Sequence, residues 1–121
     1  MNRQEQLAEI IAGIRRSIPE LNGVMVASVD GLSLSHDFPE AEADRVAAMA
    51  ATTLGLGGRV SEHASLGAME ETVVRGGQGY IVVYSAGDSA ALVMSGPSSS
   101  NLGLMRIEAK AASAQIDRAL R

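Results

Sequence analysis

The side chains with the greatest capacity for acid–base or metal chemistry are two histidines and one pair of adjacent carboxylates. His36 and His63 lack the HExxH spacing of zinc proteases, and the chain has no cysteine that could complete a metal site. Glu70 and Glu71 fall on a predicted strand, where neighbouring side chains point to opposite faces, so they cannot act together as acid and base. We therefore expect neither a catalytic residue nor a bound metal.

Two further segments partly match functional motifs, the first a nucleotide-binding loop and the second a serine nucleophile. Gly55–Val60 (GLGGRV) has some of the spacing of a dinucleotide-binding loop, but it lacks the third glycine and follows no predicted strand. No P-loop motif is present. The run Ser98–Ser100 has no histidine beside it and precedes a predicted helix, where serine and Asn101 are typical caps. The chain is expected to bind no cofactor.

Composition narrows the classes of partner. Fourteen acidic against ten basic side chains give a net charge of −4, which argues against a nucleic-acid binder or a polybasic membrane anchor. No apolar run approaches the roughly 20 residues of a membrane span. The absence of cysteine suits a reducing compartment. We expect a cytoplasmic protein that binds proteins or small molecules, with no nucleic-acid partner and no membrane insertion.

Apolar side chains at helical spacing predict a helix at each end of the chain. The stripe of the first helix, which ends before Gly23, consists of Leu7, Ile10, Ile11, Ile14 and Ile18. The stripe of the last helix consists of Leu102, Met105, Ala109, Ala112 and Ile116. Both helices should pack one apolar face against a sheet.

A long middle helix is predicted from Pro39, as its first helical residue, to about Ala64. Its apolar stripe consists of Val46, Met49, Thr53, Leu56 and Val60. Gly57 and Gly58 predict a kink or an early end, because an interior glycine costs a helix about 1 kcal/mol. Alanines and glycines broaden the helix surface, which either admits a second copy of the chain or packs closely on the protein's own sheet.

Five strands are predicted. The segment GVMVASVDGLSLS (Gly23–Ser35) contains two β-prone runs joined by Asp30-Gly31, which predicts a hairpin with a type I′ turn. Three further runs separated by two glycine-rich turns predict a meander, with strands over Met69–Arg75, Tyr80–Ser85 and Ala90–Ser95.

The apolar pattern ranks these strands by their position in the sheet. Val24–Val29 and Tyr80–Tyr84 are apolar at nearly every position, which is typical of strands covered on both faces, and the second should be central. Glu70 and Glu71 place the strand that contains them nearer an edge.

These elements together predict an α/β (α+β) fold. The order helix, two strands, helix, three strands, helix is that of a three-layer α/β/α sandwich around a five-stranded antiparallel sheet. The first and last helices should cover one face and the middle helix the other. Residues 1–121 are expected to form a single domain.

The same order of elements resembles the roadblock family, named for a dynein light chain. The segments that carry the resemblance are GVMVASVDGLSLS, EADRVAAMAATTLGLGGRVSE, RGGQGYIVVYSAGDSAALVM and NLGLMRIEAKAASAQI. The chain is similar to the short prokaryotic members that resemble gliding-motility regulators of Ras-like small GTPases. The resemblance implies a homodimer in which the third strands pair across a two-fold axis and the second helices pack side by side. It also implies a module that binds, regulates or scaffolds a small GTPase and is not itself an enzyme.

The resemblance places both predicted surfaces on the middle helix and the strand after it. The expected dimer interface consists of Val46, Met49, Ala50, Thr53, Leu54, Gly57, Glu70, Thr72 and Val74. The expected docking residues for the GTPase are Glu40, Glu42, Asp44, Arg45 and Arg59. Without the resemblance, the run Asp37–Asp44 is either a solvated helix start or an acidic patch for a basic partner.

A second function stays open on the residues alone, that of a small-molecule-sensing or scaffolding domain unrelated to GTPases. A sensor needs a pocket with a few convergent polar groups. The only aromatic residues are Phe38, Tyr80 and Tyr84, and the sequence shows no polar cluster.

Overall fold

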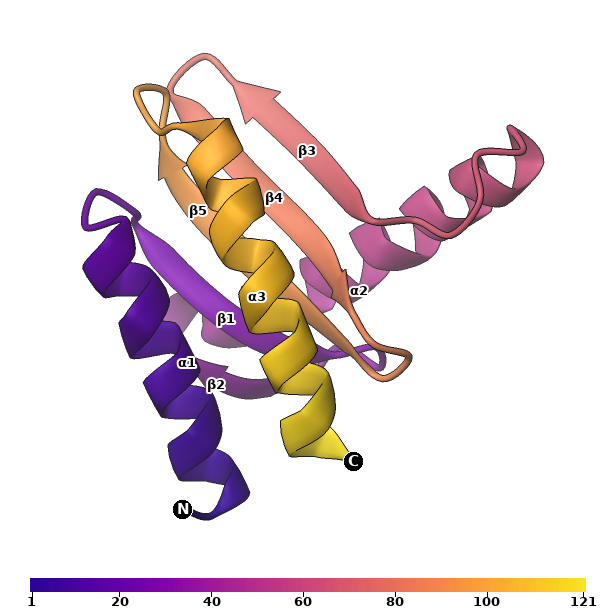
Figure 1. Cartoon of the computed structure of the whole chain (residues 1–121). Helices are drawn as coiled ribbons and strands as arrows, with labels where there is room; N and C mark the ends of the chain where they lie inside the picture. The colour runs from indigo at the N-terminus through magenta and orange to yellow at the C-terminus, as the bar shows by residue number, and fades with distance from the viewer.

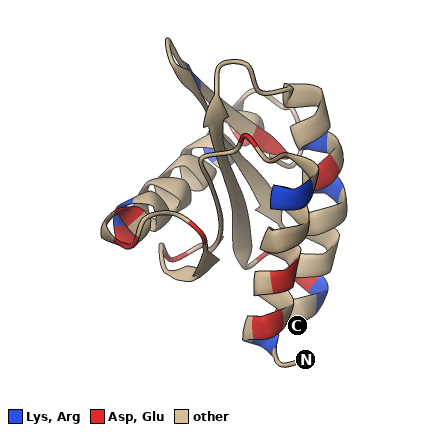
Figure 2. Cartoon of the chain, turned by 90° about the vertical axis from the view of Figure 1, so that its left-hand side faces the viewer, with Lys and Arg blue, Asp and Glu red and all other residues tan.

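Three helices and five strands form three layers in the computed structural model, which describes residues 1–121 (Figures 1 and 2). The elements are α1 (Arg3–Ser17), β1 (Gly23–Ser28), β2 (Ser33–His36), α2 (Glu40–His63), β3 (Glu71–Gly76), β4 (Gly79–Ala86), β5 (Ala90–Pro97) and α3 (Leu102–Leu120). The strands lie in the order β2-β1-β5-β4-β3, and every neighbouring pair is antiparallel. The predicted fold class and element order are confirmed. None of the three helices is both long enough and apolar enough to cross a membrane.

The sheet has a separate apolar core on each face. On one face, α1 and α3 pack through residues such as Leu7, Ile11 and Ile116 against Val24 and Leu92. The core on the other face joins α2 to the sheet through Met25, Ala27, Phe38, Ala43, Val46, Ala47, Ala50, Val83, Ala91 and Val93. Strand β1 contributes to both cores, so its continuous apolar run is explained by helices on both sides, as predicted.

Two of the helix starts follow from asparagine caps. Asn2 Oδ1 accepts from the Glu5 N–H at 2.8 Å, while the Asn2 N–H donates to Glu5 Oε1 at 3.1 Å, which is a capping box. Asn101 Oδ1 accepts from the Leu104 N–H at 3.0 Å, so the predicted cap of the last helix is confirmed. The prediction for Pro39 is wrong by one residue. Its ψ of 135° is extended, so Pro39 precedes the helix and Glu40 begins it.

The turn between β1 and β2 also differs from the prediction. A type I′ turn requires positive φ at both central residues, but Gly31 has φ 92° whereas Asp30 is not in the positive-φ region. The connection is a four-residue loop between Ser28 and Ser33, in which the Gly31 N–H donates to the Ser28 carbonyl at 3.0 Å. The extra length brings Gly31 against the backbone of Ala48 in α2.

The two edge strands of the sheet are unlike each other. Strand β2 has four residues, its register against β1 shifts between Val26 and Ala27, and the Gln4 side-chain amide donates to its Leu34 carbonyl at 2.7 Å. Strand β3 forms the opposite edge, as predicted from its glutamates. Strand β4 lies inside the sheet, between β3 and β5, as its continuous apolar run predicts.

Helix α2 is unbroken from Glu40 to His63, so it does not end early at Gly57 and Gly58. Its 24 residues extend about 36 Å, whereas the six residues of β3 span about 20 Å. Apart from Ser61, its buried residues all lie between Ala43 and Ala50. The second half of α2 therefore extends past the edge of the sheet, as Figure 1 shows.

Close packing against strand β3 explains why residue 57 of the helix is a glycine. A Cβ at this position would overlap Thr72 Oγ1 of β3 and lie 3.3 Å from Met69 Cγ. Gly55 and Gly58 have no such neighbours within 4 Å. Gly57 thus lets strand β3 and the segment before it approach α2 closely.

Asp37 joins three segments near the start of α2. Its Oδ1 accepts from the Val24 N–H at 2.7 Å, and its Oδ2 lies 3.2 Å from Nε of Arg15, whose guanidinium also donates to the Leu21 carbonyl. The carboxylate therefore connects the end of α1, the start of β1 and the loop after β2.

We expect Asp37→Ala to lower the free energy of unfolding by about 2 kcal/mol, because it leaves the Val24 N–H and Arg15 without their charged acceptor. Urea denaturation measures the change. The control is Glu9→Ala, which removes an exposed ion pair with Arg16 (3.0 Å) and should change stability by less than about 0.5 kcal/mol. Equal effects of the two substitutions would contradict the role assigned to Asp37.

Candidate functional site

An apolar groove lies between the second half of α2 and the edge strand β3. We call it the α2–β3 groove; it encloses about 520 Å³ and is lined by Thr52, Thr53, Leu56, Gly57, Val60, Ser61, Leu66, Met69, Glu71, Thr72, Val73 and Val74. Leu56, Val60 and Val74 are each more than half exposed, and Leu66 is 70% exposed. A contiguous apolar surface of this kind usually marks a protein interaction site.

The structure brings four of the residues predicted for the dimer interface into this groove: Thr53, Gly57, Thr72 and Val74. Met49 is exposed one turn before Thr53 on α2, Leu54 packs partly against the core beneath α2, and Glu70 is exposed just before β3. Val46 and Ala50 are 7% and 2% exposed and belong to that core. They pack α2 on its own sheet, so little of either side chain is left for a second molecule.

Sequence reasoning left three prominent groove residues out of the predicted interface: Leu56, Val60 and Leu66. Leu56 and Val60 continue the apolar stripe of α2, and a stripe by itself does not show where the sheet beneath it ends. A comparison of lengths would have separated its two halves, because a helix of about 36 Å cannot be covered by strands of about 20 Å. Leu66 follows the helix and gives no periodic signal.

The predicted docking residues are all exposed, but they do not form one cluster. Glu40, Glu42, Asp44 and Arg45 lie in the first turns of α2, where Figure 2 shows charged residues at the start of the helix. Glu40 Oε1 is 3.1 Å from Nε2 of His36. Arg59 lies about four turns further along the helix, near the α2–β3 groove.

A second concave site lies on the opposite face of the sheet, in the angle between α3 and β3. We call it the Tyr84 cleft; it encloses about 530 Å³ and is lined by Met69, Glu70, Glu71, Tyr84, Ser85, Arg106, Ala109, Lys110 and Ser113. Arg106 Nε donates to both oxygens of Glu71 at 2.9 Å, and Arg106 Nη2 lies 2.8 Å from Oε2. This ion pair connects α3 to the edge strand.

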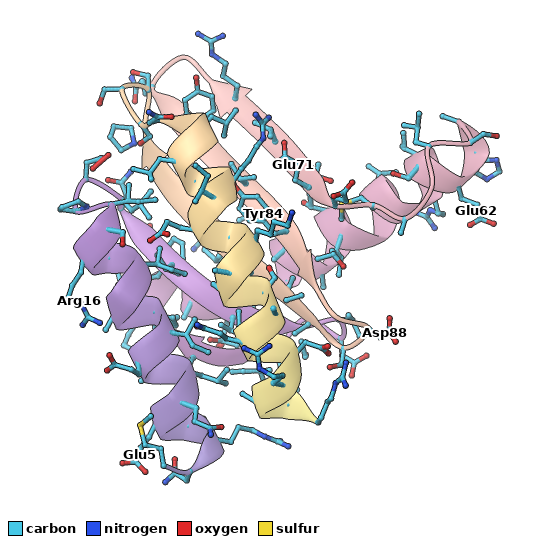
Figure 3. The ribbon with its side chains drawn as sticks, in the orientation of Figure 1. Glu5, Arg16, Glu62, Glu71, Tyr84 and Asp88 are labelled. Carbon is cyan, nitrogen blue, oxygen red and sulfur yellow. The ribbon has the colours of Figure 1, made fainter.

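The hydroxyl of Tyr84 is the unusual group of this cleft. Tyr84 is opposite Glu71 in the β3–β4 pairing, its side chain is 5% exposed, and its hydroxyl has no hydrogen-bond partner (Figure 3). Burial raises the pKa of this hydroxyl above its ordinary value, the charge of Glu71 raises it further, and the charge of Arg106 opposes both. The hydroxyl therefore stays protonated as a donor that lacks an acceptor.

Nothing in the sequence indicated the Tyr84 cleft. Arg106 and Glu71 are 35 residues apart, and neither lies in a motif that points to the other. Tyr84 reads as one more apolar position of a buried strand. Only the fold brings the three together.

We expect Tyr84→Phe to leave the free energy of unfolding unchanged or to raise it by about 1 kcal/mol. Phenylalanine keeps the ring in its packing, and its introduction removes a buried hydroxyl whose unmet hydrogen bond costs about 1–3 kcal/mol. Urea denaturation at pH 7 measures the difference. A loss of more than about 1 kcal/mol would show that the hydroxyl has a stabilising partner.

The unfolding free energies of the wild type and of Tyr84→Phe should diverge at alkaline pH. Because the pKa of Tyr84 is raised in the folded state, its contribution is fully present below the unfolded pKa of about 10 and is lost as the pH rises toward the folded pKa. We expect the wild type to lose about 1 kcal/mol relative to Tyr84→Phe between pH 9 and about pH 11. Parallel curves of unfolding free energy against pH would contradict the raised pKa.

Comparison with known protein families shows the family of this chain. Residues 7–95 match the family model for the Roadblock/LC7 domain. The uncharacterized protein MJ1340 of Methanocaldococcus jannaschii is 33% identical over 110 residues, which cover 85% of this chain and 96% of that protein.

Solved structures share the fold at lower sequence identity. A Roadblock/LC7 domain from Streptomyces avermitilis has a TM-score of 0.87 at 20% identity, over 93% of this chain and 96% of that chain. The gliding protein MglB from Thermus thermophilus has a TM-score of 0.85 at 20% identity, over 97% of this chain and 90% of that chain.

Proposed function

Because this chain belongs to the Roadblock/LC7 domain family, we propose that it forms a homodimer that binds and regulates a Ras-like small GTPase, without being an enzyme itself. The observation that carries the proposal is the α2–β3 groove beside an open sheet edge. In this proposal residues 1–121 act as one roadblock-like domain. The protein acts in the cytoplasm, the compartment that a chain without cysteine suits.

The proposed dimer forms by antiparallel pairing of two β3 strands across a two-fold axis. Such pairing satisfies the unpaired backbone groups of the β3 edge and extends each sheet into the other. The second halves of the two α2 helices then lie on the same face and cover each other's apolar residues. The interface residues in this arrangement are the exposed Met49, Leu56, Val60, Glu70 and Val74 and the half-buried Thr53, Gly57 and Thr72.

The family supports both parts of the proposal. A solved structure of MglB is described with a tetrameric arrangement, so that protein, which shares this fold, assembles from several copies. The resemblance to gliding-motility regulators implies a small GTPase as partner. The chain offers no nucleotide-binding loop of its own, which fits a protein that acts on a GTPase from outside.

The start of α2 is the proposed docking site for the GTPase, because its exposed charges stay free when the groove is covered. Glu40, Glu42 and Asp44 give this end of the helix a negative field, with Arg45 beside them. Exposed charges of this kind steer the encounter more than they lengthen the lifetime of a complex. The association rate should therefore fall as salt is raised, while the dissociation rate changes little.

The test has two parts, oligomeric state and partner. Light scattering at micromolar concentration should give twice the chain mass. The dimer is then titrated against the small GTPases of its source, each loaded with GDP or with a GTP analogue, while binding and GTP turnover are measured. Preference for one nucleotide state, or a change in turnover, supports regulation. Absence of binding to every GTPase in both states would overturn the proposal.

A further inference from the structure

We propose that the Tyr84 cleft binds a small ligand with a carboxylate or a phosphate group, held between α3 and strand β3. The proposal does not rest on the GTPase role: the cleft lies on the α3 side of β3 and the α2–β3 groove on its α2 side, although Met69 and Glu71 line both. A small-molecule sensor needs a pocket with convergent polar groups, which the sequence did not show. The Tyr84 cleft is such a pocket.

Three hydrogen-bond donors in this cleft have capacity to spare. Arg106 binds Glu71 through Nε and Nη2, which leaves Nη1 without a partner. Lys110, one turn further along α3, makes neither an ion pair nor a side-chain hydrogen bond. The Tyr84 hydroxyl is the third donor. Carboxylate and phosphate oxygens are the acceptors that arginine and lysine bind most strongly.

The buried hydroxyl is the second, independent sign of a ligand. A buried polar group normally has a partner, and the ring of phenylalanine would fill the same space without needing one. The Arg106 side chain is 53% exposed and that of Glu71 is 24% exposed, so this pair forms an outer wall of the cleft. In this proposal the bound anion is the acceptor that the Tyr84 hydroxyl lacks.

The carboxylates of the cleft restrict the ligand further. The charge of Glu71 is balanced by Arg106, but Glu70 is exposed on the lining and repels a second negative group. The ligand should therefore carry its acid at the end toward Lys110 and a neutral or positive group at the end toward Glu70. A cleft of about 530 Å³ lies within the usual range for small-molecule sites.

The experiment is a titration of the full chain, labelled with nitrogen-15, with inorganic phosphate in one arm and acetate in the other. Sodium chloride keeps the ionic strength constant. We expect saturable shifts of the amide signals of Glu71, Tyr84, Arg106 and Lys110. Binding in the phosphate arm alone assigns a phosphate ligand, binding in the acetate arm alone assigns a carboxylate, and binding in both supports the shared chemistry.

Three variants make the result specific to the cleft. Tyr84→Phe and Lys110→Gln should each raise the dissociation constant about fivefold, since each removes one donor. Arg118→Gln removes an exposed positive charge elsewhere on α3 and should leave the constant unchanged. Unsaturable shifts with both probes, or equal binding by all three variants, would overturn the proposal. Amide signals that match the wild type away from the cleft confirm that each variant folds.

Discussion

Val74→Arg is expected to convert the proposed dimer into a folded monomer, with the dissociation constant raised at least about a hundredfold. Val74 is 51% exposed, lies on the edge strand and lines the α2–β3 groove. Paired β3 strands would hold the two arginines close to the two-fold axis, where like charges repel and their desolvation is unfavourable. Analytical ultracentrifugation over a wide range of concentrations measures the change.

The matched control for this substitution is Ile107→Arg. Ile107 is 68% exposed on α3, which covers the other face of the sheet, so an added charge there should leave the mass unchanged. Circular dichroism establishes that both variants fold. The proposed interface is wrong if the wild type is a monomer, or if the two substitutions shift the dissociation constant equally.

The second large effect is expected from Gly57→Val, which should lower the free energy of unfolding by about 2 kcal/mol. Its side chain would overlap Thr72 Oγ1 and crowd Met69, so β3 or α2 must move. Overpacking of this kind typically costs about 1–3 kcal/mol. The displaced strand would also weaken dimer formation, because it is the one that pairs.

Gly58→Val is the control, one residue further along the same helix. A Cβ at Gly58 meets nothing within 4 Å, so valine there should change stability by less than about 0.5 kcal/mol. Both variants are measured by urea denaturation in the Val74→Arg background, where only contacts within one chain contribute. Equal effects at the two positions would show that the approach of β3 to α2 does not depend on Gly57.

The architecture was predictable because its signals are local and periodic. The run from Val24 to Val29 is apolar on both faces, and a strand of that kind needs helices above and below it. Asn101 follows a serine run and begins a helical stripe, so the cap was predictable as well. In each case one short segment contains the whole physical reason for the structure.

The errors arose where a distant segment determines the local structure. Gly57 is typical of a helix break, but helix α2 continues through it. The close approach of Thr72 in β3 explains why this residue is a glycine. The loop that contains Asp30-Gly31 is longer than the dipeptide suggests, and it places Gly31 beside Ala48 of α2. Local propensity could not anticipate either contact.

The two candidate sites were predictable to different degrees, for a related reason. The α2–β3 groove combines a helix stripe with an adjacent strand, so some of its residues could be named from periodicity and family resemblance. The Tyr84 cleft combines single residues of β3, β4 and α3 that share no pattern. Its chemistry exists only in three dimensions.

In the proposed dimer, the difference between the two sheet edges would limit the number of copies that can join by strand pairing. When two molecules pair through the same edge strand across a two-fold axis, that edge is covered in both molecules and can pair with no third one. The far edge, β2, is short, interrupted by a register shift and already holds the Gln4 amide on Leu34, so it is a poor template for another strand. In the proposed dimer, strand addition would therefore end after a single round, and the product would be a closed particle with no free strand edge from which a fibril could elongate.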